Sequence, residues 1–325
     1  MQLLLKYRTQ AFLLLALLVS FVVSQASDNI DGYVLQIMLV AGINIILAVS
    51  LNLVNGHTGQ FSLGHAGFMG VGAYMSAAVS VEMGPSILGL LGGPSTLSHG
   101  VTFVIALLVG GLCAAVCGWM VGVPSLRLRG DYLAIVTLGF NEIIRVVFQN
   151  TSSSGPFGGA LGMRGIPDYS TFFWVFGIAA ICIYVVASMV NSTYGRGFLA
   201  VRDDEVASES MGVNTVRYKV VAFVLGAFFA GLAGGLYAHL FGAIDPKGFG
   251  FLKSVDIIIM VILGGMGSTL GVVVAAIGLT ALNEQLRDAE KFRMIVFSIL
   301  LIVMMIVRPQ GLLPVTFEKK RRKSA

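Results

Sequence analysis

Charged residues at helical spacing inside an apolar segment are the first candidates for chemistry in this sequence. In "FNEIIRVVFQN", Glu142 and Arg145 stand at positions i and i+3, the spacing for an ion pair on one helix face. Such groups are costly in lipid and usually face a bundle interior or a cavity. One interpretation is a charged-ligand site or a proton relay, and the other is a self-neutralising pair that fixes helix packing. The pattern favours the structural intramembrane pair.

A second set of polar residues lies in a glycine-rich stretch, "GQFSLGHAGFMGVGAY". Five of its sixteen residues are glycine, and it carries Gln60, Ser62 and His65. Gly costs roughly 1 kcal/mol against Ala in a helix interior, so this is a weak helix. One interpretation is close helix packing through glycines spaced by three. The other is that the chain enters the membrane partly unwound after Asn55 and Gly56, which is tolerated where backbone is buried in protein or lines a watery cavity.

The histidines form no familiar catalytic or metal-binding pattern. The four of them make no HExxH or HxxxH pair, and the sequence has no GxSxG and no GxxxxGK[ST]. We therefore predict no catalytic residue, no metal site and no cofactor bound by this chain. If ATP drives the protein, another subunit must bind the nucleotide.

The composition is that of a membrane protein. Of the 325 residues 56% are hydrophobic and 11% charged, and the mean hydropathy is +0.88. A soluble fold could not hide this much apolar surface, so the sequence predicts an all-α, polytopic transmembrane helix bundle, with residues 1–325 forming a single domain. The net charge of +5 comes largely from the tail "EKKRRKSA", residues 318–325, and indicates a cytoplasmic tail beside lipid rather than a nucleic-acid partner.

About ten segments have the length and apolarity of a spanning helix, which needs about 20 residues. They are 9–27, 33–54, 61–82, 100–123, 131–150, 171–190, 217–240, 252–266, 268–286 and 292–308. The stretch "GGMGSTLG" between the eighth and ninth segments is either a tight turn between two helices or a kink within one. Residues 1–26 resemble a cleaved signal peptide, but an uncleaved first helix completes the topology better.

The basic residues predict which side of the membrane holds the termini. With ten spans, the loops on the side of both termini carry fourteen Lys and Arg residues and those on the other side carry six. Positive charge concentrates on the cytoplasmic side, so both termini are expected there.

The longest polar segment on that side predicts a short helix. In "GRGFLAVRDDEVASESMGV", three acids, Asp203 to Glu205, cluster where a helix would begin, and acids there complement the helix dipole. Gly212 suits the C-terminal cap. The helix is expected at about 203–211. It is either a handle for a cytoplasmic partner or a solvated connector.

This segment, followed by "YKVVAFVLGAFFAGLAGGLYAH", resembles the membrane subunits of bacterial ABC importers. The stretch "SLNLVNGHTGQFSLGHAGFMGVGAY" resembles the M-type permease subunits of branched-chain amino acid importers, and "DYLAIVTLGFNEIIRVVFQN" and "VDIIIMVILGGMGSTLGVVVAA" are similar to that family as well. The resemblance covers about residues 32–311. It is more specific for the family than for the substrate, because related permeases import urea and short amides.

The resemblance implies a permease in the bacterial inner membrane that works with several partners. These are a second homologous permease, which makes a heterodimer, two cytoplasmic ATPases that bind ATP and Mg, and a periplasmic substrate-binding protein. The implied activity is the import of Leu, Ile and Val by alternating access, along a path expected to present few charges. Import of urea, short amides or other amino acids is an alternative, and an ATP-independent carrier or channel is another.

The resemblance also assigns roles to residues. Those implied in coupling to the ATPases are Arg202, Asp203, Asp204, Glu205, Ala207, Glu209 and Gly212. This sequence departs from the importer pattern, because Glu205 lies seven positions before Gly212 rather than six, and Val206 replaces the first Ala. Candidates for the translocation path are Asn44, Asn52, Gly59, Gln60, Ser62, Gly64 and His65.

Overall fold

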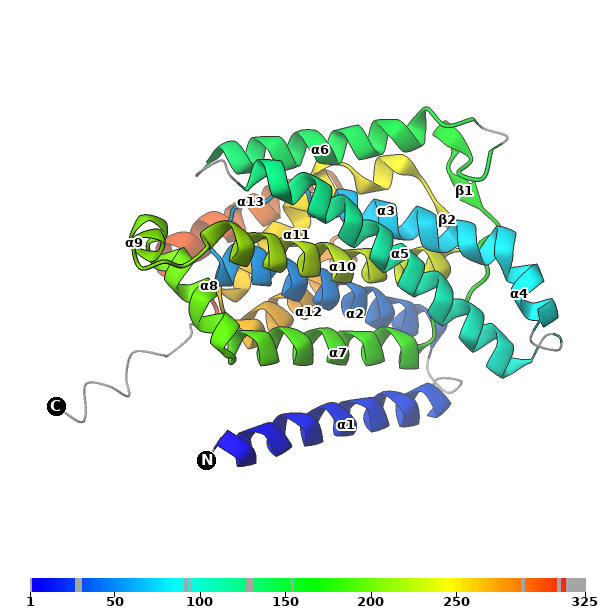
Figure 1. Ribbon diagram of the computed structural model, residues 1–325. Coiled ribbons are helices and arrows are strands. Elements are labelled where there is room, and N and C mark those ends of the chain that lie inside the picture. The colour runs from blue at the N-terminus through cyan, green and yellow to red at the C-terminus, as the bar shows by residue number, and fades with distance from the viewer. Residues whose placement is uncertain are drawn as a thin grey trace.

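The computed structural model describes residues 2–26, 31–90, 93, 95–126, 131–152, 155–287, 290–308 and 311–313. Long helices run roughly parallel to one another and form a bundle (Figure 1). The basic tail predicted at 318–325 lies outside the described residues. The α-helices are α1 (Gln2–Ala26), α2 (Gly32–Asn52), α3 (His65–Ala78), α4 (Gly84–Leu90), α5 (Thr96–Ser125), α6 (Asp131–Gln149), α7 (Phe172–Val190), α8 (Thr193–Asp203), α9 (Glu205–Ser210), α10 (Thr215–Phe241), α11 (Phe251–Gly264), α12 (Thr269–Gln285) and α13 (Glu290–Val307).

The remaining elements are short. Two are single π-helical turns, η2 (Leu53–His57) and η3 (Val79–Met83), and two are 3₁₀ turns, η4 (Gly159–Leu161) and η5 (Pro246–Phe249). The strands β1 (Met163–Arg164) and β2 (Ala243–Ile244) pair antiparallel, with Met163 opposite Ile244. This pairing fastens the α6–α7 connection to the α10–α11 connection at one end of the bundle (Figure 1).

The predicted helical bundle is confirmed, and each predicted span corresponds to a helix. Five stretches are long and apolar enough to cross a membrane: Gly32–His57, Leu97–Ser125, Tyr132–Gln149, Phe172–Val190 and Thr215–Phe241. Two shorter apolar helices are Leu13–Gln25 and Thr269–Gln285. The stretch at 264–271 is a turn between α11 and α12, not a kink. The number of crossings and the side of the termini stay predictions.

Helix ends are fixed by side chains that accept hydrogen bonds from the first free N–H groups, the usual role of Ser, Asn and Asp at an N-cap. The capping residues are Asp31 for α2, Ser95 for α5, Ser192 for α8, Asp204 for α9, Asn214 for α10 and Ser268 for α12. The polar positions between apolar segments therefore set where each helix begins.

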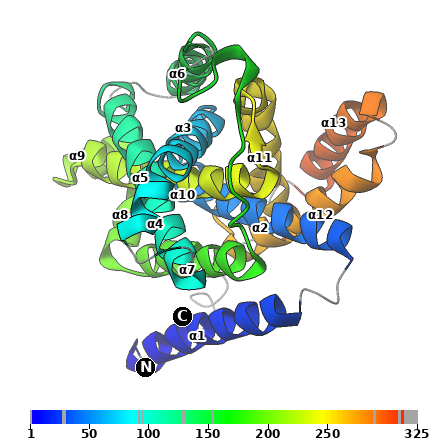
Figure 2. The ribbon, with the colours of Figure 1, turned by 90° about the vertical axis from the view of Figure 1, so that its right-hand side faces the viewer.

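Helix α10 occupies the centre of the bundle and packs against α2, α3 and α5 (Figure 2). Small residues allow the close approach. A Cβ on Gly231 would lie 2.5 Å from Cβ of Ala114 on α5, and a Cβ on Gly234 would collide with the carbonyl oxygen of Met69 on α3. Small residues thus bring helix backbones into near contact within the apolar core, and α1, α6 and α13 lie at the periphery (Figure 2).

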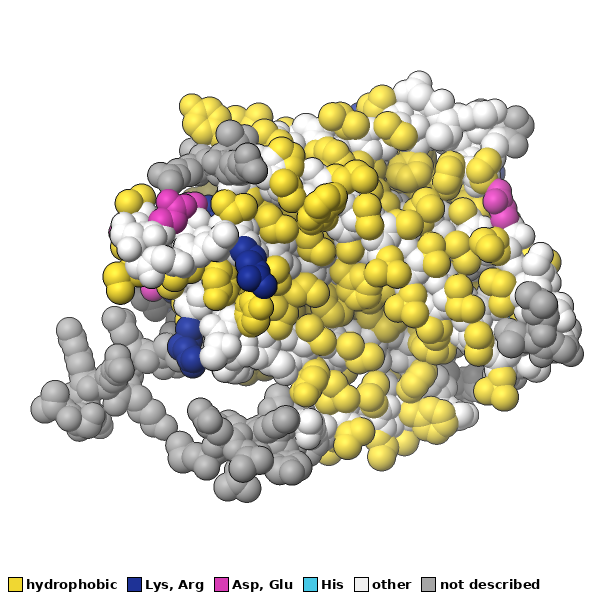
Figure 3. Space-filling view, in the orientation of Figure 1, with side chains coloured by type: hydrophobic (Ala, Val, Ile, Leu, Met, Phe, Trp, Pro, Cys, Tyr) yellow, Lys and Arg dark blue, Asp and Glu magenta, His cyan; other side chains and the backbone are white. Residues whose placement is uncertain are grey.

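Hydrophobic side chains cover the body of the face seen in Figure 3, whereas charged side chains gather at its ends, chiefly around α8 and α9. A bundle that exposes apolar side chains along its length and charge at its ends suits a bilayer, because lipid satisfies apolar groups and leaves charge to the aqueous margins.

Candidate functional site

The backbone is broken between α2 and α3. Helix α2 continues through η2, residues 58–64 are not helical, and α3 begins at His65. The span predicted at 61–82 is therefore wrong at its start. Gln60 and Ser62 are buried, and Phe61 between them is exposed. Irregular backbone is tolerated at membrane depth when protein covers it. The surrounding helices must therefore supply hydrogen-bond partners for the backbone groups that lack helical hydrogen bonds.

Side chains from the same region and from distant helices satisfy the N–H groups of the break. Ser62 N–H donates to Oδ1 of Asn55 (3.3 Å), Leu63 N–H to Oγ1 of Thr137 on α6 (3.0 Å), and Ala66 N–H to Oγ of Ser254 on α11 (3.2 Å). Two other helices thus hold the break open at its α3 end.

Two glycines allow the approach of neighbouring elements to the break. Gly59 has φ +71°, in the left-handed region that favours glycine, and a Cβ there would lie 2.9 Å from Cγ of Arg202. A Cβ on Gly64 would lie 2.7 Å from the carbonyl oxygen of Thr137. Both glycines predicted to line the path are therefore required by local packing, independently of any role in translocation.

Several buried polar atoms at the break have no hydrogen-bond partner among the described residues. Both amide atoms of Gln60, Nε2 of His57 and Nδ2 of Asn52 are in this state, as are both amide atoms of Asn141, which faces Gly67 on α3. Leaving such a group unpaired costs about 1–3 kcal/mol. Any polar group that pairs with these atoms would lower the free energy of this region.

The other predicted path residues have partners. Oγ of Ser50 and Nε2 of His65 lie 2.9 Å apart, and both side chains are buried, which joins α2 to the start of α3. Oδ1 of Asn52 accepts the N–H of Gly267, in the α11–α12 turn, at 2.8 Å. His65 and Asn52 thus fix the two sides of the break.

Asn44 does not join this group. Its Nδ2 donates to Oγ1 of Thr280 on α12 at 2.9 Å, two helical turns before Asn52. It ties α2 to α12 inside the bundle. The sequence analysis grouped Asn44 with Asn52, but the two side chains bind different partners in different parts of the bundle.

The short helix predicted at 203–211 is α9, and its limits differ from the prediction. Asp204 is the N-cap, with Oδ1 accepting the N–H of Ala207 at 3.0 Å. Gly212, at φ +80°, closes the other end, where its N–H donates to the carbonyl of Glu209 at 2.9 Å. Arg202 and Asp203 belong instead to α8, a helix that the sequence analysis missed.

Two contacts clamp α9 to the start of α10. Glu205 forms an ion pair with Lys219 at 2.6 Å, and Oγ1 of Thr215 donates to Glu209 at 2.8 Å. The Lys219 side chain is only 8% exposed, so the charge pair is largely removed from solvent. These two contacts therefore join α9 to the start of α10.

Arg202 links this end of the molecule to the break. Its guanidinium pairs with Asp203 at 2.9 Å and donates to the carbonyl oxygen of Gly56 at 3.5 Å. Its stem packs over Gly59. Arg202 is thus a direct contact between the end of α8 and η2.

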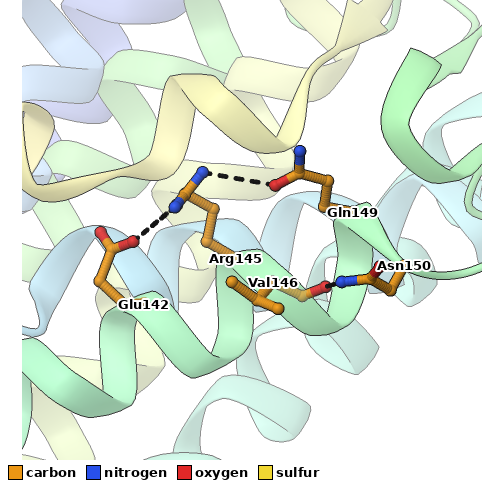
Figure 4. Close-up of polar contacts among 5 residues, drawn as sticks. All are labelled: Glu142, Arg145, Val146, Gln149 and Asn150. Carbon is orange, nitrogen blue, oxygen red and sulfur yellow. Dashed lines mark hydrogen bonds and ion pairs between the residues drawn. The ribbon is translucent and has the colours of Figure 1, made fainter.

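Glu142 and Arg145 form the ion pair that their spacing predicted. Nη2 of Arg145 lies 2.7 Å from Oε2 of Glu142, and its Nη1 donates to Gln149 at 3.4 Å (Figure 4). The side chains are not buried, since Arg145 is 28% and Glu142 37% exposed. They line a hollow beside α11 rather than a helix contact.

The sequence analysis missed the partners that come from other helices. Thr137, Ser254 and Thr280 are single hydroxyl residues in apolar helices, and Lys219 lies just inside a predicted span. A polar residue in an apolar helix signals a buried partner, but its identity depends on how the helices pack.

The fold and site define a class of protein: a polytopic helical membrane protein with a broken helix inside the bundle and a short exposed helix at one end. The chain matches, over residues 33–308, the family described as "Branched-chain amino acid transport system / permease component", and it belongs to that family. It is therefore a multi-pass protein of the inner membrane.

Curated relatives agree with this membership. The chain is 34% identical to the "High-affinity branched-chain amino acid transport system permease protein LivM" of Salmonella typhimurium, covering 97% of this chain and 76% of the relative. It is 35% identical to the protein of the same name in Escherichia coli, covering 94% and 74%. The corresponding permease protein LivH of Escherichia coli is 25% identical over 82% of this chain and 90% of the relative. No solved structure matches the chain.

Proposed function

We propose that this chain is the membrane-spanning permease subunit of an ATP-driven importer for branched-chain amino acids. Membership of the permease family and the similarity to proteins named LivM support the substrate class. The structural observation that carries the coupling to ATP is α9, a capped helix clamped to the central helix α10. A carrier driven by an ion gradient gives no reason for such a helix.

The exposed surface of α9 suits a protein partner. Val206 on α9 is 58% exposed, and Met211, the C-cap residue directly after α9, is 85% exposed. Exposed apolar side chains with a polar rim are typical of protein–protein contacts. We infer that α9 docks into a groove of a cytoplasmic ATPase, and that the ATPases hold the ATP and Mg.

Two further partners belong to the proposal. One bacterium, Escherichia coli, has both a LivM and a LivH, and the chain is similar to both, which supports a heterodimer of two related permeases. A periplasmic binding protein would deliver the amino acid at the end opposite α9, where β1 and β2 lie.

The proposed mechanism is alternating access. ATP binding moves the ATPases together, and α9 passes that displacement to α10 as a rigid unit. Arg202 passes it to the break through Gly56. New partners for the Gln60 and Asn141 amides would lower the free energy of the protein. We infer that the break is the part of the bundle that changes its contacts.

Uptake of radiolabelled leucine and radiolabelled urea by a strain with and without the gene tests the substrate. We expect leucine uptake to need the gene, to stop when cellular ATP is depleted and to survive collapse of the proton gradient. Unchanged leucine uptake in the deletion strain contradicts the proposal, and gene-dependent urea uptake indicates the urea and amide permeases instead. Uptake that follows the ion gradient indicates a secondary carrier.

A further inference from the structure

A cavity of about 360 Å³ lies between α6 and the segment that runs from η5 into α11. Five charged residues line it: Glu142 and Arg145 from α6, and Lys247, Lys253 and Asp256 from the other wall. A cavity of this size is within the range that takes up small molecules. Charge is expensive beside apolar helices and usually marks function.

The opposite wall is folded against α6. Phe249 of η5 is buried against Tyr74 of α3, with ring centroids 6.1 Å apart. A Cβ on Gly250 would lie 3.6 Å from Cδ of Arg145, so η5 leads the chain directly onto the charged face of α6. Figure 4 shows Arg145 and Gln149 pointing from α6 toward the yellow ribbon of this region.

The charges are mixed in sign and arranged by wall. On α6, Glu142 already holds Arg145 at 2.7 Å. The second wall carries two ammonium groups, Lys247 and Lys253, on either side of Gly250, and then a carboxylate, Asp256. Lys253 and Asp256 already interact within the protein, so a ligand would share or exchange these contacts. A simple anion would meet two carboxylates here, whereas a zwitterion can place each of its ends against the opposite charge.

A second, smaller cavity begins at Asp256. It is also lined by Asn283 of α12, whose Oδ1 is buried without a hydrogen-bond partner among the described residues. This cavity offers only about 10 Å³, and Asp256 already interacts within the protein, so a ligand's ammonium group would reach the Asp256 carboxylate from the larger cavity and share it. The wall of the larger cavity also includes the exposed side chains of Phe251 and Leu252, which suit an apolar side chain.

We propose that this mixed-charge pocket binds an α-amino acid by its head group, with the carboxylate at Lys247 and Lys253 and the ammonium group at Asp256. The apolar side chain lies against Phe251 and Leu252. The proposal rests on the proposed function in amino acid import, and it departs from the path with few charges that the sequence suggested. It also explains how a permease tells a zwitterion from uncharged urea.

The test uses the complete transporter, with its ATPases and binding protein, in proteoliposomes. We expect Lys247→Gln, at an exposed position, to raise the leucine concentration for half-maximal uptake about tenfold. Asp256→Asn should also raise the leucine concentration for half-maximal uptake. Arg164→Gln, an exposed cation on β1 outside the pocket, serves as the matched control and leaves uptake unchanged.

Ligand analogues assign the two ends. Leucinamide lacks the carboxylate and 4-methylpentanoate lacks the ammonium group. If the head group is held as proposed, Lys247→Gln weakens competition by 4-methylpentanoate and leaves competition by leucinamide unchanged, and Asp256→Asn does the reverse. A merely structural role would shift both analogues equally.

The outcomes separate this proposal from the proposed function. Absence of ATP-dependent leucine uptake by the wild-type transporter overturns the function, and the pocket with it. Normal wild-type uptake with unchanged concentration dependence in Lys247→Gln and Asp256→Asn overturns the pocket alone. Loss of co-purification with the second permease in these variants shows a subunit contact instead, which also overturns it.

Discussion

The α9 end of the molecule and the break between α2 and α3 differ in whether their polar side chains have hydrogen-bond or ion-pair partners. At the α9 end, Asp204 caps the helix, and Glu205 and Glu209 are held by Lys219 and Thr215. At the break, Gln60 and Asn141 are buried without partners among the described residues. These three acids of the first region have partners, whereas the second region has buried amide atoms without partners among the described residues.

The difference suggests a division of roles within the proposed mechanism. A paired, partly buried cluster resists rearrangement, because breaking one contact leaves a charge behind. Unpaired buried groups favour any conformer or ligand that satisfies them. We infer that α9 moves without deforming and that the break deforms when it moves.

The largest effect is expected from Gly56→Ala at the break. A Cβ there would collide with Oδ1 of Asn52 and the backbone nitrogen of Gly267, which separates η2 from the α11–α12 turn. Overpacking costs roughly 1–3 kcal/mol, occasionally more, and this collision involves backbone, so we expect about 3 kcal/mol. Thermal unfolding in detergent and leucine uptake should both fall sharply. Gly278→Ala, with no atom within 4 Å of the new Cβ, is the control, and equal behaviour of the two variants would contradict the packing described here.

The second effect tests the clamp. Lys219→Met leaves Glu205 unpaired, and because that side chain is 23% exposed we expect a loss of about 2 kcal/mol, below the full cost of a buried charge. Changing both Lys219 and Glu205 to Met should recover part of the loss, since no charge is then left behind. Chemical unfolding measures both variants. Arg217→Met, an exposed cation on the same helix, should have no effect, and a double variant as unstable as the single one would speak against the clamp.

The smallest effect on stability has the opposite sign. Gln60→Met removes two buried amide atoms without partners, so the protein should gain about 1 kcal/mol while leucine uptake falls. The control is Gln149→Met, because Gln149 already accepts a hydrogen bond from Arg145 and should bring no gain. A destabilised Gln60→Met protein would mean that the amide has a partner in the native state.

The helices were predictable because apolar length and polar caps are local. The helical segments and the cap of α9 by Gly212 follow from residues close in sequence. For 264–271 and for the glycine-rich stretch the sequence left two interpretations open, and the structure has a turn at the first and a non-helical segment, 58–64, at the start of the second. The first residue of a helix was harder to predict. Helix α3 begins at His65, and distant residues bind the N–H groups on either side of this start: Thr137 binds that of Leu63 and Ser254 that of Ala66.

The rest depends on how distant helices pack. Nothing near Glu205 points to Lys219, and nothing near Asn44 points to Thr280. The spacing of Glu142 and Arg145 predicted their ion pair, but Lys247, Lys253 and Asp256 reach the same cavity only because η5 folds against α6. Roles of these residues in coupling and in the path stay predictions.

The central claim is that α9 transmits ATP hydrolysis to the path, and Met211→Glu tests it most directly. Met211 is 85% exposed, so the substitution should leave stability unchanged while placing a charge on the proposed docking surface. Leucine uptake and ATP hydrolysis are measured on the same proteoliposomes, with Leu97→Glu, 84% exposed at the opposite end, as control. We predict that Met211→Glu lowers the leucine moved per ATP at least about tenfold and that Leu97→Glu does not. An unchanged ratio of leucine to ATP in Met211→Glu would contradict the account.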